Sequence, residues 1–310
     1  MPAVTAGHPS PARAALWMAA ALTSFSIMAV SGREAGPVMP TADLLVWRSV
    51  IGAIVVCAIL PFAALGAGQL RTKRLPQHFG RNLFHFFGQY CWYTAVTMIP
   101  LAQLFALEFT SPIWVALLAP LLLGERFTIW KAVAITMGFA GVLLVVRPID
   151  VDVGFSLDEG QVWALLSAIG FAGNMIATKR LSATETSLCI VFYMTVMQAP
   201  MGMIVSGGLP MVPPDLEIAL WTLALGLGGL SAHFCLAQAF RHADATVVAP
   251  MDFARLPLIA IVGMLAYGEA LDPYVFAGGA LIFLGNYLNI RVQARRRPPV
   301  VSGAAASGRR

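Results

Sequence analysis

The chain has 310 residues, 58% of them hydrophobic and only 11% charged, with a formal net charge of +5. A soluble domain carries about 25% charged residues, so this composition excludes an ordinary water-soluble protein. About 20 apolar residues cross a hydrocarbon core as one helix, and several uncharged stretches approach or exceed that length. They are Ala14–Gly32, Asn82–Leu107, Gly160–Thr178, Thr186–Pro214, Ile218–Phe240 and Pro273–Ile290. We therefore expect an all-α integral membrane protein that crosses the bilayer many times.

Ten transmembrane helices are predicted. In chain order they lie near 14–32, 42–64, 82–99, 101–123, 128–146, 160–178, 186–206, 217–240, 245–267 and 273–290. The long apolar run after Asn82 is divided at Ile99-Pro100-Leu101, because a proline marks a helix boundary. Without this division there would be nine spans, and the two termini would lie on opposite sides of the membrane.

Basic residues are distributed unevenly between the loops that these spans define. With the N-terminus inside, sixteen of the twenty Lys and Arg residues lie on the cytoplasmic side, and only Arg33 and Arg147 lie outside. Basic residues collect on the cytoplasmic side of membrane proteins. The charge pattern therefore favours ten spans in the inner (cytoplasmic) membrane with both termini cytoplasmic. The positive net charge follows from this bias and indicates no nucleic-acid partner.

The first span and the cysteines each allow a second interpretation. A signal peptide would need a basic start and a clean cleavage site of small residues, which the start of this chain lacks, so we expect a retained span. The cysteines sit singly in apolar spans without CxxC spacing, which favours buried thiols over disulfides or metal ligands. These cysteines are Cys57, Cys91, Cys189 and Cys235.

The two halves of the chain share one pattern. A shift of 144 residues places Glu108 on Asp252 and the pair Gly124-Glu125 on Gly268-Glu269. Each half then holds five spans, an odd number, so the second copy enters the membrane inverted. Inverted repeats are typical of secondary transporters, whose substrate site lies near the midplane between the halves. The predicted organisation is a cytoplasmic tail at 1–13, five-helix repeats at 14–147 and 160–291, an acidic external linker at 148–159 and a basic cytoplasmic tail at 292–310.

The segment YTAVTMIPLAQLFALEFTSPIWVALLAPLLLGERFTIWKAVAITMGFAGVLLV and its counterpart GEALDPYVFAGGALIFLGNYL resemble the EamA-type transporters of the drug/metabolite transporter superfamily. The resemblance covers roughly residues 14–291. It rests on Arg48 in the second span, the Tyr93/Ala95 pair, Pro112 and the Gly-Glu pairs after spans four and nine, although Pro257 lies one position off the repeat register. It implies movement of small metabolites, amino acids or nucleotide-like compounds without an attached ATPase.

Three charged residues remain deep within the predicted spans. At 1.5 Å per residue, Glu108 and Asp252 lie roughly 10 Å from opposite edges of the membrane and Arg255 lies near its midplane. A charge at a helix centre costs about 2.5–3.5 kcal/mol on insertion scales, so it persists where it faces a cavity or a partner. Asp252 and Arg255 either neutralise each other or line a cavity in which Arg255 binds an anionic group. Glu108 is either a structural acid or a coupling carboxylate.

Other polar side chains within the spans are secondary candidates for substrate binding or coupling. Arg48 is close to the outer end of its span, so it either extends to Glu34 or Asp43 or faces the interior. A lone histidine in a span is either hydrogen-bonded to a neighbouring helix or titrating. The further candidates are Tyr93, Asn174 and His233.

Absent motifs narrow the function. The sequence has no GxxxxGK[ST] and hence no ATP site of its own, no HExxH, and no Ser–His pair that a helix could align. We expect a permease rather than an enzyme, with no cofactor and no metal; an intramembrane enzyme or sensor is the alternative. The expected partners are a small-molecule metabolite and the lipid bilayer, with a proton as candidate coupling ion. Glycines at 138–141 and 278–279 suit close helix packing or a homodimer contact.

Overall fold

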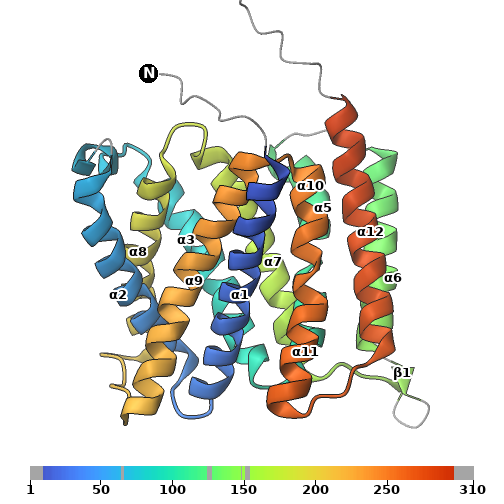
Figure 1. The fold of residues 1–310 in the computed structure, drawn as a ribbon, viewed down its shortest axis with the longest axis horizontal. Coiled ribbons are helices and arrows are strands. Elements are labelled where there is room, and N and C mark those ends of the chain that lie inside the picture. The colour runs from blue at the N-terminus through green and yellow to red at the C-terminus, as the bar shows by residue number, and fades with distance from the viewer. Residues whose placement is uncertain (1–9, 64–65, 124–127, 148, 151–153, 297–310) are drawn as a thin grey trace, which may run out of the picture.

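The computed structural model describes residues 10–63, 66–123, 128–147, 149–150 and 154–296 as a bundle of long helices (Figure 1). The helices of the first half are α1 (Pro11–Ala35), α2 (Thr41–Ile59), α3 (Leu75–Val96), α4 (Leu101–Glu108), α5 (Ser111–Leu123) and α6 (Ile129–Val146). Those of the second half are α7 (Glu159–Leu181), α8 (Ser187–Ser206), α9 (Leu216–His242), α10 (Ala245–Phe253), α11 (Arg255–Tyr267) and α12 (Pro273–Arg296). Short 3-10 helices η1 (Leu60–Phe62) and η2 (Gly66–Leu70) precede α3, and strands β1 (Ile149–Asp150) and β2 (Gly154–Phe155) pair in the linker.

The helices make ten crossings of the bundle. Nine stretches of the described chain are long and apolar enough to span a membrane, and both α4–α5 and α10–α11 together form one such stretch each. The more polar α3, with 22 residues, is the tenth. The start of α1 and the end of α12 lie at one face of the bundle and β1 lies at the other (Figure 1). This arrangement requires an even number of crossings and agrees with the predicted ten spans.

The observed helices differ most from the predicted spans in three places. α3 begins at Leu75 rather than Asn82, because Arg81 lies inside the helix instead of in the preceding loop. Arg81 is buried, and its guanidinium donates hydrogen bonds to Thr178 on α7 (3.1 Å) and to the neighbouring Asn82 (2.8 Å). The spans predicted at 101–123 and 245–267 are each interrupted near their middle.

Both interruptions lie next to a proline. Pro112 follows Glu108 by four residues, and Pro257 follows Phe253 by four residues. A proline has no N–H for the carbonyl four residues before it, and its ring crowds that carbonyl. The α4 helix accordingly ends at Glu108 and α10 ends at Phe253. The two acids that the repeat superimposes, Glu108 and Asp252, thus lie at the ends of two equivalent half-helices.

Polar side chains compensate the backbone groups at the first interruption. The Ser111 hydroxyl donates to the Glu108 carbonyl at 2.7 Å, and the Asn286 amide on α12 donates to the Phe109 carbonyl at 3.0 Å. An unpaired carbonyl inside a bilayer costs several kcal/mol, so irregular backbone at this depth needs such partners. The break is therefore part of the packed structure.

The two halves pack as an inverted pair. α1 packs along α9 just as α7 packs along α3, while α2 packs on α8 and α6 packs on α12. Exchanging each helix for its counterpart in the other half leaves this set of contacts unchanged. A pseudo-two-fold axis in the membrane plane has this effect, and the predicted inverted repeat is confirmed.

Apolar side chains cover the outside of the bundle as well as its core. Phe105 is fully buried, yet Phe62, Ile204 and Leu265 are 89%, 80% and 76% exposed. A monomeric soluble protein does not expose apolar surface on this scale, whereas lipid tails solvate it. Cys57, which was expected to be a buried thiol, is exposed on α2, whereas the other three cysteines are buried and all four are free.

Glycines bring α6 and α12 into backbone contact. A Cβ atom at Gly141 would lie 2.6 Å from the carbonyl oxygen of Gly278, and one at Gly278 would lie 2.5 Å from that of Gly141. A Cβ atom at Gly138 would instead collide with the side chain of Ile113 on α5. These glycines serve packing within one chain, and the homodimer contact stays a prediction.

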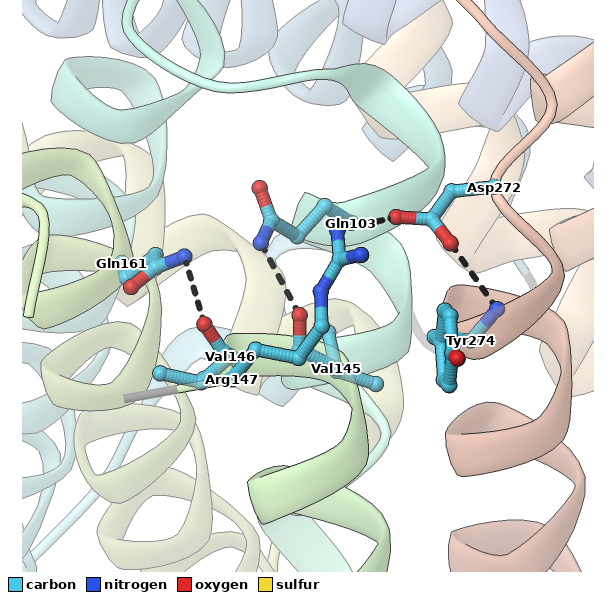
Figure 2. Close-up of polar contacts among 7 residues, drawn as sticks. All are labelled: Gln103, Val145, Val146, Arg147, Gln161, Asp272 and Tyr274. Atoms are coloured by element: carbon cyan, nitrogen blue, oxygen red, sulfur yellow. Dashed lines mark hydrogen bonds and ion pairs between the residues drawn. The ribbon is translucent and has the colours of Figure 1, made fainter. Parts of the chain in front are cut away.

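The end of α6 that lies on the same face as β1 is bound by α4, α7 and the segment just before α12 (Figure 2). The amides of Gln103 on α4 and Gln161 on α7 donate to the Val145 and Val146 carbonyls, at 3.2 and 3.4 Å. Helix C-termini leave carbonyls without intrahelical donors, and these two glutamines supply them. Arg147, which follows the helix, is paired with Asp272 just before α12. This face of the bundle is therefore held together across both repeats.

Candidate substrate site and family membership

Arg255 joins the two interrupted helices. Its guanidinium lies 3.3 Å from a Glu108 oxygen and 3.5 Å from an Asp252 oxygen. The sequence placed the two acids at mirrored depths on either side of the membrane midplane, and in the structure both contact the same guanidinium. The predicted Asp252–Arg255 pair is present. Arg255 is buried, and two carboxylates compensate its charge.

Aromatic rings enclose this ion cluster. The Arg255 guanidinium lies over the rings of Phe25, Phe105 and Phe109, at 4.5, 5.2 and 4.9 Å from their centroids. The face of an aromatic ring attracts a cation, more so away from water. The Trp92 indole donates to Glu108 at 2.8 Å. Two carboxylates and four aromatic rings therefore hold the cluster in place.

Arg48 points into the interior and has no such compensation. Its guanidinium lies against Gly229 of α9, where a Cβ atom would be only 3.0 Å from it. The acids that it was proposed to reach are engaged elsewhere: Glu34 accepts from the Tyr267 hydroxyl at 2.7 Å, and Asp43 accepts from the Met211 backbone at 3.1 Å. Arg48 is 5% exposed, its Nε has no hydrogen-bond partner, and no described residue offers it a carboxylate.

Further buried polar atoms on α3 and α8 also have no partner among the described residues. Besides the ring nitrogens of His78, they are the hydroxyl of Tyr93, the amide oxygen of Gln89 and the amide oxygen of Gln198. Each belongs to a side chain that is at most 5% exposed. Most buried polar atoms in proteins are hydrogen-bonded, so an unpaired group calls for an explanation such as a ligand or a water. Tyr93 is one of the predicted site residues, and its hydroxyl interacts with the Arg48 guanidinium without reaching hydrogen-bond geometry.

His233 faces the same interior region. Its ring lies 5.6 Å from Phe25 and 6.2 Å from His85, both buried, and yet His233 itself is exposed. It is one helical turn after Gly229, so it lies on the face of α9 that meets Arg48. The accessible surface of His233 is thus turned toward the inside of the bundle. His85 in turn is held by Gln198 at 2.8 Å.

Asn174 lies apart from this group. Its amide oxygen accepts from Thr178, at 3.4 Å, and Thr178 accepts from Arg81. The structure therefore divides the predicted residues into three sets: Arg255, Asp252 and Glu108 in the ion cluster; Arg48, Tyr93 and His233 around α9; and Asn174 near Arg81. Sequence reasoning did not select Gln89, His85 or Gln198 as site residues. The sequence feature that could have identified them is that each is a polar side chain within an otherwise apolar helix.

The face opposite the chain ends is bridged by a second ion cluster. Arg33 on α1 is paired with Glu269, and its guanidinium lies 5.1 Å over the Tyr267 ring. Glu269 also accepts from the backbone N–H of Leu101, the first residue of α4, at 2.9 Å. One carboxylate of the second repeat therefore binds two helices of the first. The counterpart residues Gly124 and Glu125 lie outside the described residues.

The arrangement of two inverted five-helix halves has a match among known families. The sequence profile of the EamA-like transporter family matches residues 12–147 and again 159–291, once on each half. The chain belongs to the EamA-like transporter family. A solved crystal structure shares the fold, with a TM-score of 0.60 at 20% identity over 93% of this chain and 100% of that chain.

Curated relatives of this EamA-like protein are transporters by name. A riboflavin transporter of Rhizobium johnstonii is 30% identical over 92% of this chain and 94% of its own length. The pseudopaline exporter CntI of Pseudomonas aeruginosa is 30% identical over 84% and 89%, and an S-adenosylmethionine uptake transporter of Rickettsia prowazekii is 28% identical over 86% and 88%. The protein is a multi-pass membrane transporter.

Proposed function

We propose that this protein is a secondary transporter that moves a small metabolite with an anionic group across the cytoplasmic membrane by alternating access. The observation that carries the proposal is the contrast between the two interior arginines. Arg255 has two carboxylate partners, whereas Arg48 is buried with none. Burying an unpaired charge costs several kcal/mol, and a substrate carboxylate or phosphate would remove that cost by pairing with the planar guanidinium.

The groups around Arg48 add a second requirement on the substrate. Tyr93, Gln89 and Gln198 leave one hydroxyl and two amide oxygens unpaired. Amide oxygens only accept hydrogen bonds, so the substrate should carry N–H or O–H donors besides its anionic group. A small polar metabolite of the amino-acid or nucleotide-like type meets both conditions. The relatives are named for three different compounds and for both uptake and export, so family membership selects neither the compound nor the direction.

We further propose that Glu108 and Asp252 carry the coupling proton, if transport is driven by a proton gradient. Both acids bind one guanidinium at the ends of α4 and α10. Those two half-helices belong to opposite repeats, so relative movement of the repeats would release one acid from Arg255. A released carboxylate in an apolar environment takes up a proton more readily than one beside a cation. The protonation state of the Arg255 cluster would then depend on which face of the bundle is open.

Metabolite profiling tests the substrate proposal. Cells that produce the protein should accumulate or lose at least one anionic metabolite relative to cells that produce Arg48→Gln, a variant with matched membrane load. We expect a change of about tenfold or more in that pool, the scale of losing at least one charge-assisted hydrogen bond. If the pool changes equally in cells that produce the wild type and in cells that produce Arg48→Gln, the proposed role of Arg48 is contradicted. If only cationic compounds change, the proposed substrate class is contradicted.

The orientation of the bundle is a separate prediction. The start of α1 and the end of α12 share one face, and the bias of Lys and Arg toward that face predicts that it is cytoplasmic. Reporter fusions at Pro298 and within residues 150–159 should report the cytoplasm and the outside, respectively. Fusions with the reverse pattern would invert the assignment of the Arg33–Glu269 cluster from the outer to the inner face.

A further inference from the structure

Three potential metal ligands converge where α3 begins and α8 begins. His78, Glu185 and Cys189 each offer one ligand atom, and these atoms all lie within 4.8 Å of one another. The Cys189 sulfur is 3.5 Å from a Glu185 oxygen. Ligand atoms of a tetrahedral zinc site are about 3.5 Å apart, given metal–ligand distances of 2.0–2.3 Å. The cluster is thus close to the dimensions of a tetrahedral site and needs only small side-chain rotations to match them.

His78 supplies an independent indication of a ligand. The side chain is 0% exposed, and neither of its ring nitrogens has a hydrogen-bond partner among the described residues. A buried imidazole without any partner is unusual, because at least one nitrogen normally donates or accepts. Its ring packs against Tyr193 on α8, with centroids 4.6 Å apart, which turns His78 toward the helix that carries Cys189.

The local structure holds the other two ligands in position. The Thr186 hydroxyl accepts from the Cys189 backbone at 3.1 Å and caps the start of α8, so Cys189 lies in the first turn of that helix. A bound metal ion would replace the proton that the Cys189 thiol donates to Glu185, because the thiolate is the form that binds metal. The Thr72 hydroxyl donates to Glu185 at 2.6 Å and orients that carboxylate. Such outer partners are typical of metal sites.

We propose that His78, Glu185 and Cys189 form a site for a divalent transition-metal ion of the zinc class, at the face that carries the chain ends. One imidazole nitrogen, one carboxylate oxygen and one thiolate make three tetrahedral positions and leave the fourth to water. The prediction from the sequence that Cys189 is not a metal ligand did not anticipate this cluster, because the spacing of 111 residues from His78 hides it.

The site would connect the two repeats. His78 is on α3 of the first repeat, while Glu185 and Cys189 belong to the second. A bound ion would therefore fix the two halves to each other at this face. The loop residues Ser182, Ala183 and Thr184 beside Glu185 are exposed, so an ion can reach the cluster from solution.

Cobalt binding tests the site, because Co²⁺ takes the same ligands as Zn²⁺ and a cysteine thiolate bound to it absorbs in the near ultraviolet. The purified full-length protein, carrying a histidine-free affinity tag, should bind one Co²⁺ per chain with this absorption, and Zn²⁺ should displace it. Cys189→Ser should abolish the absorption, and His78→Gln and Glu185→Gln should each weaken binding by about tenfold or more. Cys235→Ser removes a different buried thiol and is the matched control, with unchanged binding expected.

Thermal unfolding provides a readout that does not depend on the colour of cobalt. Zn²⁺ should raise the melting temperature of the wild type and of Cys235→Ser, since a ligand bound only to the folded state stabilises it. The melting temperature of His78→Gln should not change when Zn²⁺ is added. If Cys189→Ser does not fold, the His78 and Glu185 variants decide the question. The proposal would be overturned if the wild type showed no thiolate–cobalt absorption, or if the three ligand variants bound the ion as tightly as the wild type.

Discussion

Replacing Arg48 with glutamine should lower the transport rate by about 100-fold or more while leaving the protein folded. Two charge-assisted hydrogen bonds from a guanidinium to an anionic group contribute about 1.5–3 kcal/mol each, and glutamine retains neither the charge nor the planar fork. Arg48→Lys keeps the charge but not the planar fork, so we expect its transport rate to lie between those of the wild type and Arg48→Gln. Initial rates in membrane vesicles, with the metabolite identified by profiling, measure the effect.

Stability provides the second half of this test. Arg48 has no carboxylate partner among the described residues, so its removal leaves no buried acid unpaired. The melting temperature of Arg48→Gln without substrate should therefore equal or exceed that of the wild type, and added substrate should no longer raise it. Arg147→Gln, at a half-exposed arginine paired with Asp272, is the matched control and should transport normally. Wild-type transport by Arg48→Gln would refute the anchoring role.

Replacing Arg255 with glutamine should have the opposite signature, a large loss of stability. Glu108 and Asp252 would then lie in the interior without the cation that they share. Removing one partner of a buried ion pair costs about 3–5 kcal/mol, because the other charge stays behind. We expect poor yield and a strongly lowered melting temperature for Arg255→Gln. Adding Glu108→Gln and Asp252→Asn to it should restore most of the lost stability.

Transport by these variants separates a structural cluster from a working one. The triple variant should fold. Because its cluster has no titrating group, it should not respond to an imposed pH gradient. Its transport rate should be no more than a small fraction of the wild-type rate. Full transport by the triple variant, with unchanged pH dependence, would mean that the cluster only holds α4 and α10 together. It would also exclude Arg255 as the residue that binds the anionic group of the substrate.

The sequence was sufficient to predict the crossings and the inverted repeat, since these follow from apolar length, basic-residue bias and internal similarity. It did not predict the direction in which a side chain points. Arg48 lies on a helix that is apolar on nearly every side, so its depth was readable and its rotation toward Gly229 was not. For Glu108 and Asp252 it did not predict the interruptions beside them, because α4 and α10 end where continuous spans were expected.

The start of α3 was missed for a related physical reason. A search for charge-free stretches places Arg81 outside the span, whereas tertiary contacts with Thr178 bury it within the helix. The convergence of His78 with Cys189 was also hidden, because only the packing of α3 against α8 brings the two residues together. A single sequence does not show which distant segments contact each other.

The polarity of α3 has a consequence for how the protein is made. An arginine within a span costs about 2.5–3.5 kcal/mol on insertion scales, and the groups that bind Arg81 and Asn82 belong to Thr178 on α7 and Tyr193 on α8. The ribosome delivers α3 roughly a hundred residues before either partner exists. We therefore expect the nascent first half to insert α3 only weakly by itself. Synthesis of the second half then supplies the partners that make the final position of α3 stable.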